Sequence, residues 1–128
     1  MGKLFLLIIL VLGAAFYFPQ TRPVMLEGLA PVLNPVLSWQ TTGEITQINR
    51  ELQTLSRSGQ SLPSPGEGFQ DWMNRNFQGG SSLDAWGNIY SLRLWRDSVG
   101  VVSRGPDLEI DTPDDIVKSI GIVRTRRR

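Results

Sequence analysis

The sequence predicts an α+β fold in which an N-terminal transmembrane segment is followed by an amphipathic helix and a short helix packed on a small antiparallel sheet. Three observations support this prediction. The chain opens with an unbroken apolar run, its middle carries apolar residues at helical spacing, and its last third is β-branched and aromatic around tight turns. With 128 residues, 41% of them hydrophobic, the chain has room for one small domain and an appendage.

The first segment, residues 1–18, is expected to be a signal anchor or transmembrane helix. Residues 4–18 are all apolar, follow Lys3 and end in three aromatic side chains before Pro19. Fifteen helical residues span only about 22 Å, less than the roughly 30 Å hydrocarbon core of a bilayer. A cleaved signal peptide therefore stays open as the alternative.

Residues 19–40 are predicted to form a membrane-proximal linker. Their apolar residues recur at helical spacing, but Pro31 and Pro35 are expected to break any continuous helix. A kinked segment on a membrane surface and partial packing on the domain are both compatible with this pattern.

A capped amphipathic helix is expected to begin at residue 41. Thr41 and Glu44 have the spacing of a capping box, and Gly59 is a typical helix stop. Between them four apolar residues form a stripe on one face: Ile45, Ile48, Leu52 and Leu55. The stripe lasts barely two heptads, so it predicts a core contact rather than a coiled coil.

A short helix and two or three strands are expected after this helix. The segment Ser64-Pro65-Gly66-Glu67 predicts a second helix start, and Gly79-Gly80 predicts its end. Its aromatic face is predicted to fill the core: Phe69, Trp72, Met73 and Phe77. Residues 88–95 and 99–103 predict an antiparallel hairpin, and residues 116–123 predict a third strand or a helical turn.

The loop before residue 116 is acidic and holds the candidate metal ligands. Five carboxylates fall within nine residues, which follow Gly105-Pro106 and include Pro113: Asp107, Glu109, Asp111, Asp114 and Asp115. Like charges about 4 Å apart repel by roughly 4 kcal/mol near a protein surface, so the loop needs a cation or full solvation. A chain with no His and no Cys offers only oxygen ligands here, which favours Ca²⁺ and excludes a conventional zinc site.

Composition excludes further classes of function. Without Cys the chain has no disulfide, lipoprotein anchor or thiol nucleophile. It also lacks a phosphate-binding glycine fingerprint, so we expect no enzyme. The net charge of +1 argues against nucleic acid as a partner, because the basic residues gather only in a tail at residues 124–128.

Two segments, taken together and in order, resemble the type II secretion major pseudopilin (pseudopilin G) family. That family carries Asp-Pro-Trp-Gly-Asn-Pro-Tyr and then Ser-x-Gly-Pro-Asp-Gly-x-Phe-Gly-Thr-x-Asp-Asp-Ile. The chain supplies these residues of the first segment: Asp84, Trp86, Gly87, Asn88 and Tyr90. It supplies these of the second: Ser103, Gly105, Pro106, Asp107, Thr112, Asp114, Asp115 and Ile116. The resemblance implies a pseudopilin-like domain over residues 41–123.

In that family the loop binds a structural Ca²⁺, which agrees with the prediction from charge. We therefore predict side-chain ligands from Asp107, Asp114 and Asp115. Three residues are predicted to add main-chain carbonyls: Ser103, Glu109 and Thr112. We predict that Trp86 packs under the hairpin while Gly87 and Asn88 turn the chain into its first strand.

The chain also departs from the family. The prepilin leader, the Gly-Phe cleavage site and the early helix glutamate are missing, and Ala85 and Ile89 replace two prolines. Leu108 and Asp111 replace two loop glycines, which is costly for Leu108 if either position needs a positive φ.

The resemblance implies a membrane-anchored structural subunit of a type II secretion or type IV pilus-like apparatus. It implies a single pass through the inner (cytoplasmic) membrane with the C-terminal domain periplasmic or otherwise extracytoplasmic. The implied partners are protein subunits of the assembly and the membrane, with homo-oligomerisation left open. A stand-alone, membrane-tethered, calcium-dependent binding module outside any secretion machine is the alternative.

Overall fold

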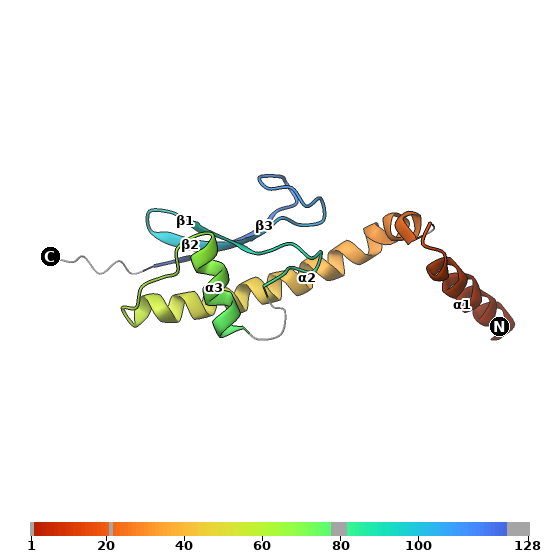
Figure 1. Cartoon of the computed structure of the whole chain (residues 1–128), viewed down its shortest axis with the longest axis horizontal. Helices are drawn as coiled ribbons and strands as arrows, with labels where there is room; N and C mark the ends of the chain where they lie inside the picture. Colours follow the sequence, from red (N-terminus) through yellow and green to blue (C-terminus); the bar gives the residue numbers. More distant parts are fainter. Residues whose placement is uncertain (1, 21, 78–81, 123–128) are drawn as a thin grey trace. The chain divides into compact units, whose positions relative to one another are not determined.

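The computed structural model describes residues 2–20, 22–77 and 82–122, and shows three helices and one sheet in an α+β arrangement (Figure 1). The helices and strands are α1 (Gly2–Tyr17), α2 (Arg22–Arg57), α3 (Glu67–Asn76), β1 (Ser91–Leu94), β2 (Ser98–Ser103) and β3 (Ile116–Gly121). The chain divides into two compact units, Met1–Pro35 and Val36–Arg128. Gly79, Gly80 and the basic tail, which carry sequence predictions, lie outside the described residues.

The predicted transmembrane segment at residues 1–18 is wrong. The apolar run does form a helix, but α1 has 16 residues and so measures about 24 Å, short of the roughly 30 Å bilayer core. Within residues 2–20, 22–77 and 82–122, no helix combines the length and the apolar character that a membrane crossing requires.

The long helix α2 begins much earlier than predicted and runs through both prolines. Arg22–Arg57 is continuous, with Pro31 and Pro35 inside it. Each proline removes one N–H donor, at a cost of about 3 kcal/mol, and the bonds of the neighbouring residues continue the helix. The predicted break over residues 19–40 is therefore wrong.

The predicted capping box at Thr41 and Glu44 is also wrong, since both residues lie inside α2. Their side chains bond to residues of the turn before β1 instead, Thr41 to Ala85 and Glu44 to Tyr90. The C-terminal end agrees with the prediction: α2 ends at Arg57, and Gly59 and Gln60 donate backbone hydrogen bonds to Ser56 and Leu55.

The core of the second unit lies between one face of the sheet and the helices α2 and α3 (Figure 1). It contains these buried residues: Ile45, Ile48 and Leu52 of α2; Phe69, Trp72 and Met73 of α3; and Tyr90, Leu92, Val99 and Val101 in or next to the strands. Leu55 and Phe77 are partly buried against it. The apolar stripe and the aromatic helix face are thus core, as predicted.

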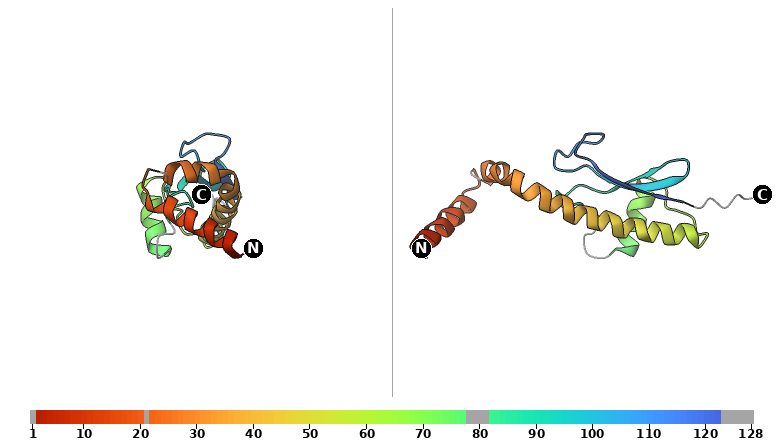
Figure 2. Two further views of the ribbon diagram at one scale, coloured as in Figure 1. Left: turned by 90° about the vertical axis from the view of Figure 1, so that its right-hand side faces the viewer. Right: turned by 180° about the vertical axis from the view of Figure 1, so that it is seen from behind.

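The sheet has the strand order β1-β2-β3 and is antiparallel throughout. Figure 2 shows this sheet from behind, alongside α2. Leu92 pairs with Val101 and Leu94 with Val99, and the backbone N–H of Trp95 closes the hairpin on the carbonyl of Ser98. Residues 116–121 form a strand rather than a helical turn. Because β3 is the last strand of this sheet, one of its edges pairs with no strand among the described residues.

Candidate functional site

A buried carboxylate, that of Asp84, joins the two segments that carry the resemblance. Asp84 is only 5% exposed. Its Oδ1 accepts hydrogen bonds from the backbone N–H groups of Trp86 (3.0 Å) and Asn88 (2.8 Å). Its Oδ2 accepts from the hydroxyl of Ser103 at 2.5 Å and from Asn88 Nδ2 at 3.1 Å. Burying a charge is costly unless such bonds surround it, so this carboxylate holds both segments in place.

A tight turn places the donors around Asp84. The N–H of Gly87 donates to the carbonyl of Asp84 (3.0 Å), and the N–H of Asp84 donates to the carbonyl of Asn88 (2.7 Å). Gly87 has a φ of 85°, which a side chain would disfavour. The turn leads through Ile89, which bridges to Leu83, into Tyr90 and β1. Gly87 and Asn88 therefore turn the chain into the first strand, as predicted.

The second segment enters the acidic loop through Gly105. Its N–H donates to the hydroxyl of Ser103 (3.1 Å), and its carbonyl accepts from Asn88 Nδ2 (3.3 Å). Its φ is 68°, and a Cβ at this position would lie 2.3 Å from the carbonyl oxygen of Asp114. Only glycine fits here, so the start and the end of the loop are held close together.

Side chains of α2 and α3 fix the same region from the other side. The hydroxyl of Thr41 accepts a hydrogen bond from the N–H of Ala85 (3.2 Å), and the phenol of Tyr90 donates to Glu44 Oε2 (2.6 Å). Gln70 Nε2 donates to the carbonyl of Tyr90 (2.7 Å). Burial raises the pKa of Tyr90 well above its ordinary value, and the hydrogen bond to Glu44 raises it further.

Hydrogen bonds within the acidic loop converge on Asp114 and Asp115. Asp114 Oδ2 accepts from the N–H of Asp107 (3.2 Å), and Asp115 Oδ2 accepts from the N–H of Asp111 (2.8 Å). The hydroxyl of Thr112 donates to Asp114 Oδ1 (2.8 Å). This hydroxyl bond lowers the pKa of Asp114 below its ordinary value.

The two positions where the family has glycine are strained in this chain. Leu108 has a φ of 63° and Asp111 a φ of 66°, in the left-handed region that glycine adopts freely. An aspartate adopts this backbone conformation at a lower cost than a leucine. The carboxylate of Asp111 also forms an ion pair with Arg93 of β1. Arg93 therefore neutralises the charge of Asp111, a residue that is not among the predicted calcium ligands.

The structure places the predicted ligands at different depths. Ser103 is fully buried and belongs to the Asp84 network, whereas Asp107 and Glu109 are exposed. Thr112, Asp114 and Asp115 lie together at intermediate depth. Across the described ranges, no group of three acidic side chains is arranged to hold a metal ion.

The donor chemistry of the loop nonetheless suits a hard cation. All its side-chain donors are carboxylate or hydroxyl oxygens, and among the described residues only Asp111 of the five acidic residues has a cationic partner. In the described geometry Asp107, Asp114 and Asp115 do not surround an ion, so a Ca²⁺ held by them would have to draw their carboxylates together.

Trp86 has a smaller structural role than predicted. Its side chain is half-buried and does not belong to the core cluster under the hairpin. Tyr90, the other aromatic residue of the first segment, is by contrast fully buried in that cluster.

Sequence reasoning missed the part played by polar residues of α2. Thr41, Glu44 and Asn49 contact the segments that follow residue 84, and Thr41 and Asn49 are buried. Their spacing along the helix could have indicated this role. Thr41 and Asn49 each lie four residues from Ile45, which puts both on the same helix face as the apolar stripe.

No protein-family model, curated protein or solved structure matches the chain. The resemblance to pseudopilin G therefore rests on the residues of the two segments.

Removing the Ser103 hydroxyl should destabilise the domain. In Ser103→Ala, Asp84 Oδ2 loses a donor and the N–H of Gly105 loses its acceptor, both at a buried position. We expect the free energy of unfolding of the full chain to fall by about 1 to 3 kcal/mol in urea titrations. Ser119→Ala, at an exposed position, is the matched control. Equal stability of the two variants would contradict the role given to this network.

The Tyr90 phenol should make stability depend on alkaline pH. A folded-state pKa raised above 10.0 means that the neutral phenol stabilises the fold fully below pH about 10. This stabilisation is lost as the pH rises from there towards the folded-state pKa. Tyr90→Phe should be less stable than the wild type at pH 7 and should lose less stability between pH 9 and pH 11. Tyr17→Phe, at an exposed site, should follow the wild-type pH profile.

Proposed function

We propose that the chain is a pseudopilin-like structural subunit of a type II secretion or type IV pilus-like apparatus, with a domain at residues 36–122 that Ca²⁺ stabilises. One observation carries the proposal. The Asp84 carboxylate hydrogen-bonds to residues of both segments that resemble pseudopilin G, namely Asn88 in the first and Ser103 in the second. The two segments thus form one structural unit around a buried charge.

A structural role is supported by how completely that unit is bonded. Each oxygen of Asp84 accepts hydrogen bonds from two different residues. Tyr90 is fully buried, with its phenol on Glu44. Such groups are held in one position by their partners, which suits a scaffold that sets the shape of a loop.

The loop that this unit supports is the proposed calcium site. Ca²⁺ at Asp107, Asp114 and Asp115 would offset like charges on a loop that keeps Leu108 at positive φ. Oxygen sites of modules outside the cytoplasm bind Ca²⁺ with a Kd of about 10⁻⁴ to 10⁻³ M, which is sufficient where calcium is millimolar. We therefore propose that this domain lies outside the cytoplasm.

The apolar helix α1 supports assembly with other subunits. Residues 4–12 are apolar, and every one of them is between 42% and 68% exposed. A helix that is apolar on all sides is stable in water only when other molecules cover it. Packing against the α1 helices of neighbouring copies would provide that cover, as a multi-subunit assembly requires.

Calcium should stabilise the domain measurably. An ion that binds only the folded state adds RT ln(1 + [L]/Kd), so 1 mM Ca²⁺ should add about 0.4 to 1.4 kcal/mol, or a few degrees of Tm. Mg²⁺ should add less, because it gives up water reluctantly. The measurement is a thermal melt of the full chain in EDTA, in Ca²⁺ and in Mg²⁺.

Asp107→Ala should abolish the calcium response, whereas Asp71→Ala, at an exposed position of α3, should keep it. Superimposable melts of the wild type in EDTA and in Ca²⁺ would exclude the calcium site.

A subunit of a pilus-like apparatus should form filaments. We expect electron microscopy of the purified full chain in Ca²⁺ to show them, and deletion of residues 2–17 to abolish them because the apolar helix surface is lost. A full chain that stays monomeric at every concentration would contradict the proposed function.

A further inference from the structure

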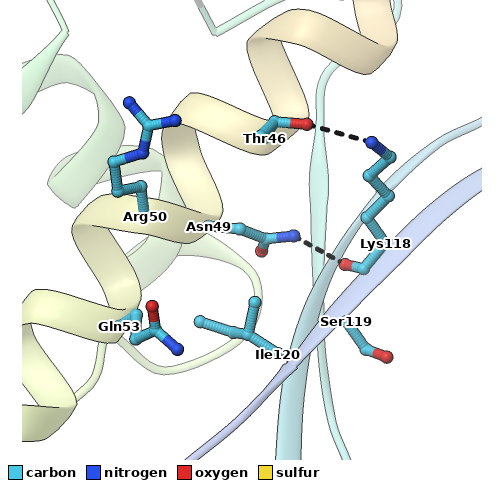
Figure 3. Close-up of a pocket in the computed structure, with 7 residues that line it drawn as sticks. All are labelled: Thr46, Asn49, Arg50, Gln53, Lys118, Ser119 and Ile120. Carbon is cyan, nitrogen blue, oxygen red and sulfur yellow. Dashed lines mark hydrogen bonds between the residues drawn. The ribbon is translucent and has the colours of Figure 1, made fainter.

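A groove lies between α2 and the edge strand β3, and its volume is about 370 Å³ (Figure 3). Arg50 and Gln53 extend from α2, and Lys118 and Ile120 lie across from them on β3. All of these residues belong to the second unit, and no strand in the described part of the chain pairs with this edge of β3.

A buried acceptor in this groove has no hydrogen-bond partner among the described residues. Asn49 is 3% exposed, and its Nδ2 donates to the carbonyl of Lys118 at 2.8 Å. A carbonyl can only accept, so this bond fixes the orientation of the amide. Its Oδ1 is buried and accepts no hydrogen bond from any described residue. Buried polar groups normally have partners, so this oxygen indicates that an N–H or O–H donor belongs in the groove.

The groove also carries two positive charges that no described carboxylate neutralises. The guanidinium of Arg50 is exposed and has no hydrogen bond or ion pair within the described ranges. The ammonium of Lys118 donates to the hydroxyl of Thr46 at 3.1 Å, and no carboxylate lies within ion-pair distance of it among the described residues. A ligand that fits must therefore combine a carboxylate with a hydrogen-bond donor, as an acidic segment of peptide does.

We propose that this groove binds residues 108–110 of a second copy of the chain. Glu109, at the outer part of the acidic loop, is exposed, and its carboxylate has no partner among the described residues. Its neighbours Leu108 and Ile110 are 53% and 45% exposed. The carboxylate of Glu109 pairs with Arg50 and Lys118 of the other copy, and a backbone N–H next to it donates to Asn49 Oδ1.

The match between the two surfaces is both electrostatic and apolar. The loop offers the carboxylate of Glu109, which the proposed calcium site and the Arg93–Asp111 ion pair leave unused, while the groove presents two cations. Ile110 and Leu108, on either side of Glu109, supply apolar surface for the side chain of Ile120 in the groove. A basic segment such as residues 124–128 would be repelled from the same groove.

This contact is heterologous, because the groove and the loop are different surfaces of one chain. Each bound pair leaves one groove and one loop free, so copies add in a row, or in a ring where the rotation between neighbours closes. The inference rests on the proposed function, since it names the contact by which subunits of such an assembly would join.

Cross-linking between introduced cysteines tests the contact directly. The chain has no cysteine, so Gln53→Cys in the groove and Ile110→Cys in the loop are the sole thiols of the variants. With a short bis-maleimide, the full chain carrying both substitutions should give a ladder of dimers, trimers and longer products. A mixture of two chains with one substitution each should stop at the dimer.

Arg50→Ala or Glu109→Gln in the doubly substituted chain should reduce the ladder by roughly tenfold or more. Arg57→Ala and Glu67→Gln are the matched controls, which alter exposed charges away from the groove and should leave it intact.

Three results would overturn the inference: no ladder, products that stop at the dimer in the doubly substituted chain, or a ladder that Arg50→Ala leaves unchanged. Filaments that form normally with Arg50→Ala would overturn this contact and leave the proposed function standing. Absence of filaments from the wild type would count against the proposed function instead.

Discussion

The burial of one carboxylate, that of Asp84, is the constraint on which the rest of the domain depends. The carboxylate can be buried to 5% exposure because hydrogen-bond donors surround its two oxygens. Those donors come from a turn before β1 and from the end of β2, so the charge decides how the two segments meet. Gly105 then starts the acidic loop where a larger residue would collide with Asp114. The shape of the proposed calcium site thus follows from a buried charge behind it.

Polar groups set in an apolar helix face extend this constraint to α2. Thr41 holds the turn, Glu44 holds Tyr90 just before the first strand, and Asn49 holds the edge strand through the carbonyl of Lys118. An apolar stripe alone allows a helix to slide or rotate on a sheet, whereas these directional bonds select one position. Asn49 uses its amide nitrogen for this purpose, and its oxygen accepts no hydrogen bond from the residues that the structure describes.

The elements with strong local patterns were predictable from the sequence. The stripe from Ile45 to Leu52, the aromatic face of α3 and the hairpin lie where their periodicity placed them. The start of α2 was not predictable from Thr41 and Glu44, because the same residue types that cap helices also make tertiary hydrogen bonds. The transmembrane prediction failed on length, since an apolar run can form a helix without spanning a bilayer. The motif identified Asp84 and Ser103, but their bond became visible only in three dimensions.

Hydrogen exchange of single backbone amides tests the central claim most directly. If the Asp84 carboxylate is a buried acceptor, the N–H groups of Trp86 and Asn88 are protected by it although they lie in a turn outside any helix or strand. We predict that both exchange only through global unfolding, as slowly as the amides of β2. The N–H of Glu109, in the exposed acidic loop, should exchange much faster. Exchange of Trp86 and Asn88 at the rate of Glu109 would contradict the account.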